Sequence, residues 1–490
     1  MKKSTNLLLT LALGSVLLAS PTIAQDNPGQ GGWTLQEAIE YAQKNNLQVK
    51  QTRVNRDLNA IDLKQAKLDR LPTLNSNGSY SFNTGSYQNP VTFDLITENS
   101  QTSNFQANTV MPLFMGFQQK NLIKQYEYDL QASEFDVQAI QNDITLQLIT
   151  SYLNVLFAEE LIKTAELQRT TTQQQLDRTR LLFKAGSVAE VAVLDLESQL
   201  ATDDLDIITA QNQRDIARLS LIQILNLENE QAQNFNIVIP DVPEPDEAPA
   251  LVDPNTVYDV ALKTQPGIQA ADLRIRSADK ALAFARGAYY PRISLGAGLN
   301  TRYLKGGQRG IGRETITGVQ QQTFYLDENG TQTQTFFIPF SREQTIYEDR
   351  NLIEQYQDNI NKNAYISASI PIFNGLAARN NVQRAKLGQL NAKLNADAER
   401  NQLRQTIEQA YVDALAAQRK YAAAKVQVQA LEKNYKNAEL RLNSGVINTV
   451  DFYVITTNYR TAQSNLIQAK YEYTFKLKVL DFYQGKEITL

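Results

Sequence analysis

VMPLFMGFQQ, residues 110–119, returns in altered form as SIPIFNGLAA, residues 369–378. A proline, a phenylalanine and a glycine match between the two stretches at one spacing, 371 − 112 = 259 residues: Pro112 with Pro371, Phe114 with Phe373 and Gly116 with Gly375. This constant spacing indicates an internal duplication, in which the chain builds one structural plan twice.

Landmarks further along the chain keep the same spacing. Tyr152 precedes Tyr411 by 259 residues, and Gly186 precedes Gly445 by 259 residues. The duplication therefore extends well beyond the opening match.

Upstream the spacing changes. Pro72 matches Pro291 at 291 − 72 = 219 residues, so the second repeat holds 259 − 219 = 40 extra residues between its two prolines. We expect a first repeat at 25–233 and a second at 256–490, joined at 234–255 by a strand and a linker rich in proline and acidic residues.

Composition excludes several kinds of chemistry. The 490-residue chain has no histidine and no cysteine, which removes imidazole bases, thiolate nucleophiles, disulfides and the usual zinc ligand sets. Its 48 basic and 52 acidic residues give a net charge of −4, with no basic stripe to suit nucleic acid. We expect no enzyme activity, no cofactor, no metal and no nucleic-acid partner.

The N-terminus reads as an export signal, with Lys2 and Lys3 before an apolar run at 7–19 and a small-residue cleavage site at 22–24. We therefore expect a signal peptide at 1–24. The apolar run is too short to span a bilayer, and no later stretch offers the ~18–20 unbroken apolar residues of a transmembrane helix. Any membrane crossing must be made by strands.

Long stretches have few helix breakers. From residue 118 to the end of the first repeat there is no proline, and Gly186 is the only glycine. This predicts a helix at 118–184, a turn, and a return helix at 188–233. The second repeat predicts helices at 377–443 and 447–484. Apolar residues recur every seventh position, so we expect coiled-coil packing, and at ~1.5 Å per residue each long helix is about 100 Å.

The apolar period changes to two between the prolines of each repeat, which predicts β-hairpins at 72–114 and 291–373. Each of the four strands has about ten residues, the length of a tilted membrane strand. Exposed strand edges are costly in lipid and four strands cannot close a barrel, so several chains must share one; three chains give twelve strands and an open lumen. The alternative is a small soluble sandwich with one wet face. The extra segment at 303–363 is expected to be a bulky hairpin, with Asn329-Gly330 suited to a type I′ turn, that forms an exposed surface loop.

The chain resembles the outer membrane factor family, the TolC-type channels of tripartite efflux and type I secretion. The resemblance lies in the order of these features, which occurs twice. The matching stretches are LQEAIEYAQKNN at 35–46, VYDVALKTQPGIQAA at 257–271, the PLFMG and PIFNG strand ends, and the glycine turns between the long helices. The resemblance covers the whole mature chain.

The resemblance implies a mainly helical fold with membrane β-structure. A homotrimer would place a twelve-stranded β-barrel, four strands per chain, in the lipid of the outer membrane of a Gram-negative-type bacterium. A twelve-helix α-barrel of long coiled-coil helices would continue it into the periplasm, with a mixed equatorial domain around it. The implied function is a passive exit channel that works with an inner-membrane transporter and a periplasmic adaptor protein.

The resemblance also suggests gate residues. In the family, acidic residues just after the second turn glycine point into the closed tunnel. Asp451 matches the first such position, whereas the second is Val454; in the first repeat the equivalent residues are Ala192 and Asp195. Asp195 and Asp451 are therefore candidate pore or gate residues. The alternative is that both are ordinary surface residues at helix starts.

Two further sets of residues are singled out by position. Candidate contacts for the adaptor lie at the two turns: Gly186, Ser187, Val188, Gly445, Val446 and Ile447. Residues expected to bend the chain from strand into helix are Pro112, Gly116, Pro371 and Gly375. A simple helix turn is the alternative for the first set.

One other class of function fits the same pattern. A structural coiled-coil protein of the envelope or cell surface, such as an adhesin or spacer, would also have long helices but would conduct no ions. A periplasmic adaptor has helical hairpins too, but adaptors carry one hairpin between β-domains, whereas this chain has two.

Overall fold

The computed structural model describes residues 32–88, 93, 95–238, 244–245, 252–305, 308–325 and 333–486. The expected signal peptide, most of the acidic linker and the expected Asn329-Gly330 turn lie outside these residues. The chain divides into two compact units. Unit 1 comprises Met1–Lys50, Ile140–Ala261 and Thr406–Leu490, and unit 2 comprises Gln51–Ala139 and Leu262–Gln405.

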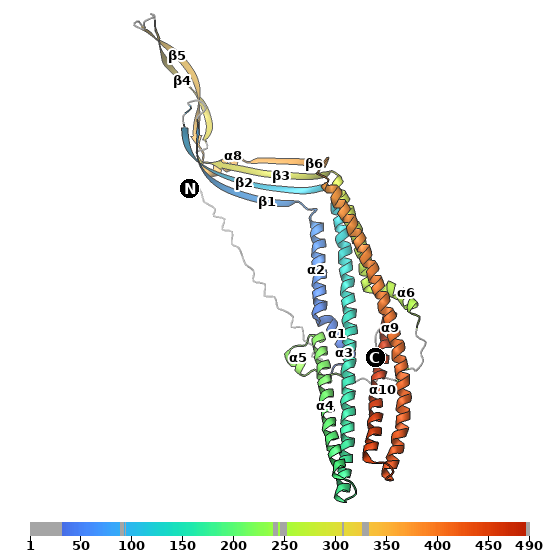
Figure 1. Cartoon of the computed structure of the whole chain (residues 1–490). Coiled ribbons are helices and arrows are strands. Elements are labelled where there is room, and N and C mark those ends of the chain that lie inside the picture. The colour runs from blue at the N-terminus through green and yellow to red at the C-terminus, as the bar shows by residue number, and fades with distance from the viewer. Residues whose placement is uncertain are drawn as a thin grey trace, which may run out of the picture. The chain divides into compact units, whose positions relative to one another are not determined.

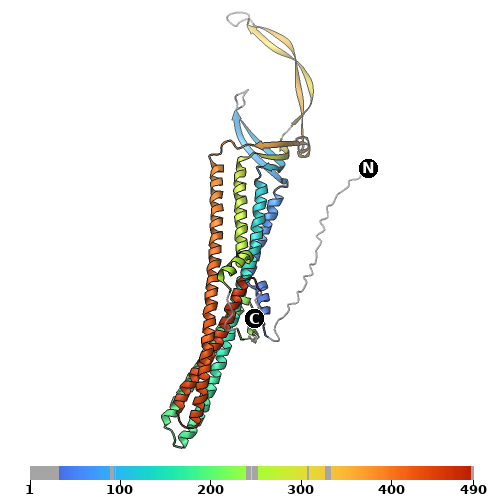
Figure 2. The same ribbon diagram turned by 90° about the vertical axis from the view of Figure 1, so that its right-hand side faces the viewer.

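Two helices of 67 residues each, α3 (Gln118–Lys184) and α9 (Ala377–Asn443), are the longest elements (Figures 1 and 2). Their bounds confirm those predicted from the scarcity of helix breakers. In unit 1, α4 (Glu190–Leu225) runs back along α3, and α10 (Thr449–Tyr483) runs back along α9. Across the described residues, every helix is too short or too polar to pass through a bilayer.

The first return helix differs from the prediction. A single helix was expected at 188–233, but α4 ends at Leu225 because Asn226 takes a left-handed conformation with φ of 55°. A separate short helix, α5 (Asn229–Gln233), follows. Asparagine tolerates this conformation better than most residues, which is why the chain turns there.

The core of unit 1 forms where α1 (Leu35–Asn45) packs against α3 and α4. Thr34 and Glu37 form a capping box that fixes the start of α1. The expected strand after residue 234 is reduced to one parallel bridge, between Trp33 and Ile237. The Tyr152 hydroxyl donates to the Val238 carbonyl beside it, so a side chain replaces part of the missing ladder.

Unit 2 holds two helices beside the upper parts of α3 and α9. They are α2 (Leu47–Leu68), most of which lies in this unit, and α7 (Pro266–Arg286), which follows α6 (Pro254–Thr264) and leads into the short 3-10 turn η1 (Gly287–Tyr289). Arg274 on α7 pairs with Asp136 on α3, and Arg400 on α9 pairs with Asp272 on α7 at 2.5 Å. These pairs tie α7 to both long helices.

A four-stranded antiparallel sheet completes unit 2 (Figure 1). Its order is β1 (Thr73–Gln88), β2 (Leu95–Met115), β3 (Arg292–Leu304) and β6 (Asn361–Ser369). β1 and β2 have 16 and 21 residues, so both are longer than the ten predicted. β1 and β6 each have one neighbour, so the sheet of this chain is open at both edges.

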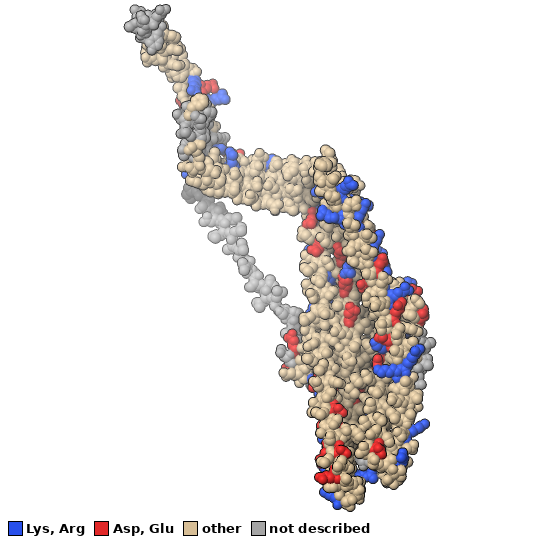
Figure 3. All heavy atoms as spheres, in the orientation of Figure 1, with Lys and Arg blue, Asp and Glu red and all other residues tan. Residues whose placement is uncertain are grey.

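The two faces of the sheet differ in polarity, because residues opposite one another in the ladder share a face. Met111 lies opposite Leu295, which lies opposite Ile366, whereas Asn108 lies opposite Asn75 on the other face. On the polar face the hydroxyls of Ser294 and Ser367 are 2.7 Å apart. The strands contain only four charged residues: Glu98, Arg292, Arg302 and Lys362. The visible side of the sheet accordingly shows almost no charge (Figure 3).

The sequence duplication is also a duplication of strand register. Thr73 pairs with Val110 in the first hairpin, and Arg292 pairs with Ser369 in the second. The two spacings of the sequence repeat connect these pairs, because 73 + 219 = 292 and 110 + 259 = 369. The two hairpins therefore pair their strands in the same register.

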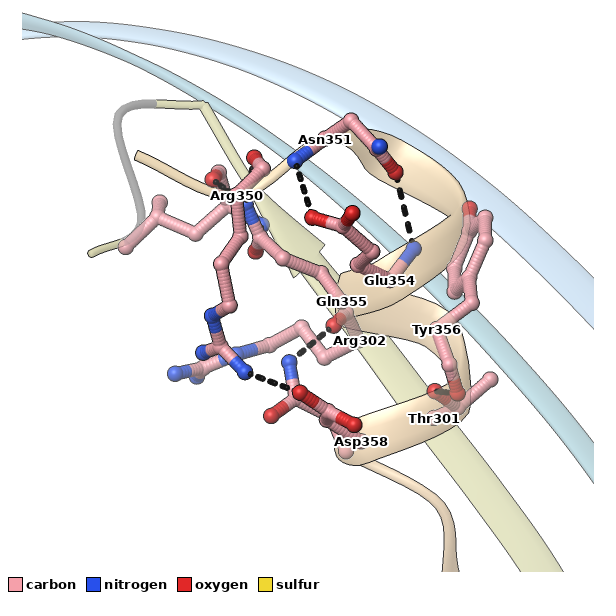
Figure 4. A network of polar contacts seen from close by, with 10 residues as sticks. Thr301, Arg302, Arg350, Asn351, Glu354, Gln355, Tyr356 and Asp358 are labelled. Atoms are coloured by element: carbon pink, nitrogen blue, oxygen red, sulfur yellow. Dashed lines mark hydrogen bonds and ion pairs between the residues drawn. The ribbon is translucent and has the colours of Figure 1, made fainter. Parts of the chain in front are cut away.

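The extra segment of the second repeat, expected to be a bulky hairpin and exposed surface loop at 303–363, has long regular strands. β4 (Gln308–Tyr325) and β5 (Thr333–Asp349) form a two-stranded antiparallel ribbon, followed by α8 (Leu352–Asp358). Alternating apolar residues supply the strand pattern, although glycines and polar residues between them suggest a loop. Figure 4 shows α8 lying against the end of β3.

Candidate functional site

Unit 1 has two turns between paired helices, one between α3 and α4 and one between α9 and α10, which we call the tip turns. Both have the same backbone geometry. Gly186 has φ +71° and donates to the Phe183 carbonyl at 2.8 Å, while Ser187 donates to the Leu182 carbonyl at 2.9 Å. This pair of bonds is a Schellman motif, which closes a helix through a left-handed residue. Glycine takes that conformation without a steric penalty.

The second tip repeats the motif with other side chains. Gly445 has φ +71° and donates to Leu442 at 3.1 Å, and Val446 donates to Arg441 at 2.9 Å. A Cβ at either turn glycine would have open space around it.

The side chains around the turns are accessible. Ser187 and Val446 are exposed, whereas Val188 and Ile447 are half-buried. Further apolar side chains are exposed on the first turns of the return helices: Val191, Leu194, Val450 and Val454. The turns therefore offer small, partly apolar surfaces to a partner.

Asp195 and Asp451 lie on different helices, α4 and α10, and both are exposed. Within the described part of the chain, neither carboxylate makes a hydrogen bond or ion pair with another residue. Asp451 occupies the third position of α10, where its backbone N–H donates to the Asn448 side chain at 2.7 Å. This placement also suits an ordinary acidic residue at a helix N-terminus.

The strand-to-helix junctions contain a left-handed pair that the sequence did not reveal. Gly116 has φ +60° and Phe117 has φ 63°; Gly375 has φ +60° and Leu376 has φ 65°. Left-handed backbone at a bulky residue is strained, so the fold must hold Phe117 and Leu376 in place. The junction role assigned to the glycines thus extends to the residue after each.

The two junctions differ in their surroundings. A Cβ on Gly116 would lie 2.4 Å from the Gly287 carbonyl oxygen and 2.9 Å from the Tyr290 Cβ. The Phe117 and Tyr290 rings meet edge to face, with centroids 5.9 Å apart. Pro112 ends the regular ladder, since the register with β3 shifts between Pro112 and Phe114.

Among the described residues, none covers the second junction. A Cβ on Gly375 would have no neighbour within 4 Å, Pro371 is exposed, and the Phe373 side chain is 81% exposed. The junction of β2 is covered by β3, whereas β6 is an edge strand with no strand beyond it.

The sequence reasoning missed a buried carboxylate between α3 and α4. Asp203 is 1% exposed and accepts hydrogen bonds from the Thr172 hydroxyl and, at 3.0 Å, from the Gln199 amide. Its position continues the apolar seam of Val193 and Leu196 at coiled-coil spacing, so an acidic residue in the seam was a detectable signal.

Asp203 borders a groove of about 410 Å³ between α3, α4 and α10. Arg460, Tyr453 and Thr457 line it from α10. Burial, together with the charge of Asp203, raises the pKa of the Tyr453 hydroxyl. No group of three or more acidic residues in the described ranges is arranged to hold a metal ion.

The Tyr152 side chain is a second buried polar group in unit 1. Tyr152 is 1% exposed, and its hydroxyl donates to the carbonyls of Val238 and Trp33, the latter at 3.3 Å. Burial and the charge of Glu37 raise the pKa of Tyr152 to about 12, so it is a hydrogen-bond donor at any physiological pH.

Comparison with known proteins identifies the family. The model of the outer membrane efflux protein family matches residues 38–227 and 343–486, which together are more than half of the chain. The chain belongs to this family. It is accordingly an outer membrane efflux protein, a member of a family of channels, located in the outer membrane and extending into the periplasm.

Individual relatives of this outer membrane efflux protein are distant in sequence. Outer membrane protein TolC of Escherichia coli strain K12 is 22% identical over 444 residues, covering 90% of this chain and 79% of TolC. Pyoverdine export outer membrane protein OpmQ of Pseudomonas putida is 23% identical over 297 residues, covering 60% of this chain and 56% of OpmQ.

Solved structures show the same fold. The outer membrane protein VceC of Vibrio cholerae matches with a TM-score of 0.69 at 13% identity, covering 93% of this chain and 97% of VceC. The CmeC outer membrane channel of Campylobacter jejuni matches with a TM-score of 0.67 at 16% identity, covering 92% of this chain and 86% of CmeC. The long helices and the four-stranded sheet thus form the fold of outer membrane channels, which confirms the predicted fold class.

Proposed function

We propose that three copies of this chain close one passive channel, which exports cargo delivered by an inner-membrane transporter through a periplasmic adaptor, in tripartite efflux or type I secretion. The observation that carries the proposal is the open sheet, with one unpaired edge at β1 and another at β6. In lipid each unpaired backbone group costs several kcal/mol, so both edges need partners.

The duplication predicts how the edges pair. Within the chain, β2 of the first repeat pairs with β3 of the second, with Thr109 opposite Ala297. Moving each residue to its repeat equivalent gives 109 + 259 = 368 and 297 − 219 = 78. Ala368 of one chain should therefore lie opposite Gly78 of the next.

The predicted register keeps apolar residues opposite one another. It places Ile366 opposite Tyr80 and Ala364 opposite Phe82, all from the apolar face of the sheet. A shift by one residue would instead mix the two faces. Two chains would give eight strands with a filled interior, whereas three give twelve and an open lumen lined by the polar face.

Disulfide trapping tests this register, since the chain has no cysteine of its own. Ser367→Cys with Ser79→Cys places the two thiols opposite one another, and oxidation should link chains into covalent dimers and trimers. Ser367→Cys with Ser81→Cys is the matched control, on the same face but two residues out of register. Equal cross-linking of both pairs, or monomers only, would refute the proposed closure.

Conductance separates a channel from a structural spacer. The purified oligomer should form ion-conducting pores in planar bilayers, and a non-conducting oligomer would support the spacer. Asp451→Asn and Asp195→Asn should each reduce cation preference if three copies of the carboxylate crowd at a constriction. Unchanged selectivity would remove that residue from the gate.

The tip turns are proposed to contact the adaptor. Val446 is 65% exposed, so Val446→Glu should leave assembly and conductance unchanged while placing a charge on the apolar tip. Export in cells should then fall. Normal export would argue against docking at this turn.

A further inference from the structure

The ribbon of β4 and β5 carries an apolar stripe along one face. The register puts Phe340 opposite Gly318, Ile338 opposite Gln320 and Phe336 opposite Gln322, all on the same face. With their neighbours they form six large apolar side chains, which we call the stripe: Ile316, Phe324, Phe336, Ile338, Phe340 and Ile346. Each is between 40% and 46% exposed.

The opposite face of the ribbon suits water. It carries Thr315, Thr317 and Ser341, a hydroxyl pair between Thr323 and Thr335 at 3.1 Å, and an ion pair between Arg313 and Glu343 at 3.2 Å. Val319, the Pro339 opposite it, and Phe337 interrupt this face. The ribbon is therefore two-sided, and the six residues of the stripe outnumber these three.

Close packing shows that the stripe has a defined shape. The Phe324 and Phe336 rings meet at 5.8 Å between centroids. The Phe340 ring covers Gly318 so closely that a Cβ there would lie 2.9 Å from it. The glycine thus leaves space for the aromatic ring, and any larger residue would displace it.

The base of the ribbon is held in place by α8 (Figure 4). The Gln355 side chain, 2% exposed, accepts from the Leu304 backbone N–H and donates to the Leu304 carbonyl, both at 3.0 Å. Asn359 donates to the Arg302 carbonyl at 2.7 Å, and Arg350 pairs with Asp358 at 2.9 Å. These bonds close the end of β3, so the ribbon starts from a fixed point on the sheet.

We infer that the stripe packs against the stripes of the other two copies of this chain. A two-stranded ribbon with one apolar face is marginally stable alone, so the stripe needs a cover. Only three residues separate β3 from β4, so in the proposed trimer three identical ribbons would start from one barrel rim at high effective concentration. The inference rests on the proposed trimer.

The charges on the ribbon favour this occupant over a lipid surface. Within the described residues the stripe side has no charged residue from Gly318 to Phe324 or from Gln334 to Phe340. Nearer the base its register positions include Arg309, Glu314, Arg342 and Glu348, two of each sign. Identical stripes can therefore meet without like-charge repulsion, whereas anionic headgroups would find no cluster of cations. Three packed ribbons would narrow the outer opening of the channel.

A single introduced cysteine tests the inference in the full-length oligomer. Ile338→Cys lies on the stripe and Gln321→Cys lies on the opposite face at nearly the same height, since Ile338 pairs with Gln320. In detergent, oxidation should link Ile338→Cys chains at least about tenfold more than Gln321→Cys chains, because the tether holds both at ~mM effective concentration but only the stripe cysteines would lie in contact.

The oligomeric mass of each sample separates the two proposals. An intact trimer with equal cross-linking at both positions would overturn the ribbon inference and leave the channel untouched. Protection of Ile338→Cys from a soluble maleimide only after transfer into lipid vesicles would assign the stripe to lipid instead, and would also overturn it. A monomer would end both proposals.

Discussion

Replacing the junction glycines by alanine is the most informative perturbation, because Gly116 and Gly375 have the same backbone and different neighbours. Both have φ +60°, so alanine costs about 1–2 kcal/mol at either position for the left-handed conformation alone. At Gly116 the new Cβ would also lie 2.4 Å from a backbone oxygen of Gly287, and the forced shift adds about 1–3 kcal/mol.

In a single chain Gly375→Ala should show only the first cost, because no atom of the described residues lies within 4 Å of its Cβ position. In the proposed trimer the repeat supplies a neighbour, since 287 − 219 = 68 and 290 − 219 = 71. Leu68 and Leu71 of the next chain would then take the places of Gly287 and Tyr290. The trimer of Gly375→Ala should lose about as much stability as that of Gly116→Ala.

The assay is the temperature at which the detergent-solubilised trimer dissociates, followed by gel mobility and by circular dichroism. Gly186→Ala is the matched control, because its φ of +71° demands a left-handed residue in open space. Asparagine tolerates the left-handed conformation but still needs space for its side chain. Gly375→Asn therefore lowers the backbone cost and keeps the steric cost. If Gly375→Ala melts no lower than Gly186→Ala, no neighbouring chain approaches that junction and the repeat-derived contact is wrong.

Three further substitutions test the helical unit. Tyr152→Phe should destabilise by about 1–3 kcal/mol in denaturant unfolding, because it removes the donor of the buried Trp33 carbonyl and of the half-buried Val238 carbonyl. Asp203→Ala should cost a similar ~1–3 kcal/mol, because the buried Thr172 hydroxyl would lose its carboxylate acceptor and keep only the Gln168 carbonyl at 3.2 Å. The exposed neighbour Asp204→Ala should cost less than about 1 kcal/mol. A hydrogen bond from a lysine of α10 lowers the pKa of Asp413, so its contribution is present above the unfolded carboxyl pKa and is lost as pH falls through the folded value. The melting temperature of the natural chain should therefore fall when the pH drops below about 4. It should fall less in Asp413→Asn, because the pair contributes at most about 1 kcal/mol of stability.

The helical part of the fold was predictable because its signals are local. Without proline and almost without glycine, the stretches now seen as α3 and α9 had no other regular structure open to them. The end of α4 was missed because Asn226 is compatible with a helix interior, and only the left-handed turn in the structure shows that it ends one. Strand ends were harder still, since β1 continues through Asn83, Thr84 and Gly85, residue types that suit turns equally well.

The site was predictable in position but not in surroundings. Turn glycines and tip aspartates follow from spacing, whereas the burial of Asp203 and the left-handed Phe117 depend on contacts made by distant parts of the chain. The hairpin at 303–363 was predictable from its turn residues, but the length of its strands was not, because their apolar residues are separated by glycine and glutamine.

The duplication connects the contact inside the chain with the contact proposed between chains. The pairing of β2 with β3 joins a first repeat to a second, and the proposed pairing of β6 with the next chain's β1 joins a second repeat to a first. Three chains would then make a ring of six similar hairpins, with one kind of strand pairing between neighbouring hairpins. The ribbon breaks that similarity, because only the second repeat carries it. Alternate hairpins of the ring would then bear a ribbon, and each stripe would face two others rather than an immediate neighbour. A substitution that weakens the pairing between hairpins should therefore act on all six contacts when it is made in both repeats. A substitution in the stripe should instead change the outer opening and leave the pairing between hairpins intact.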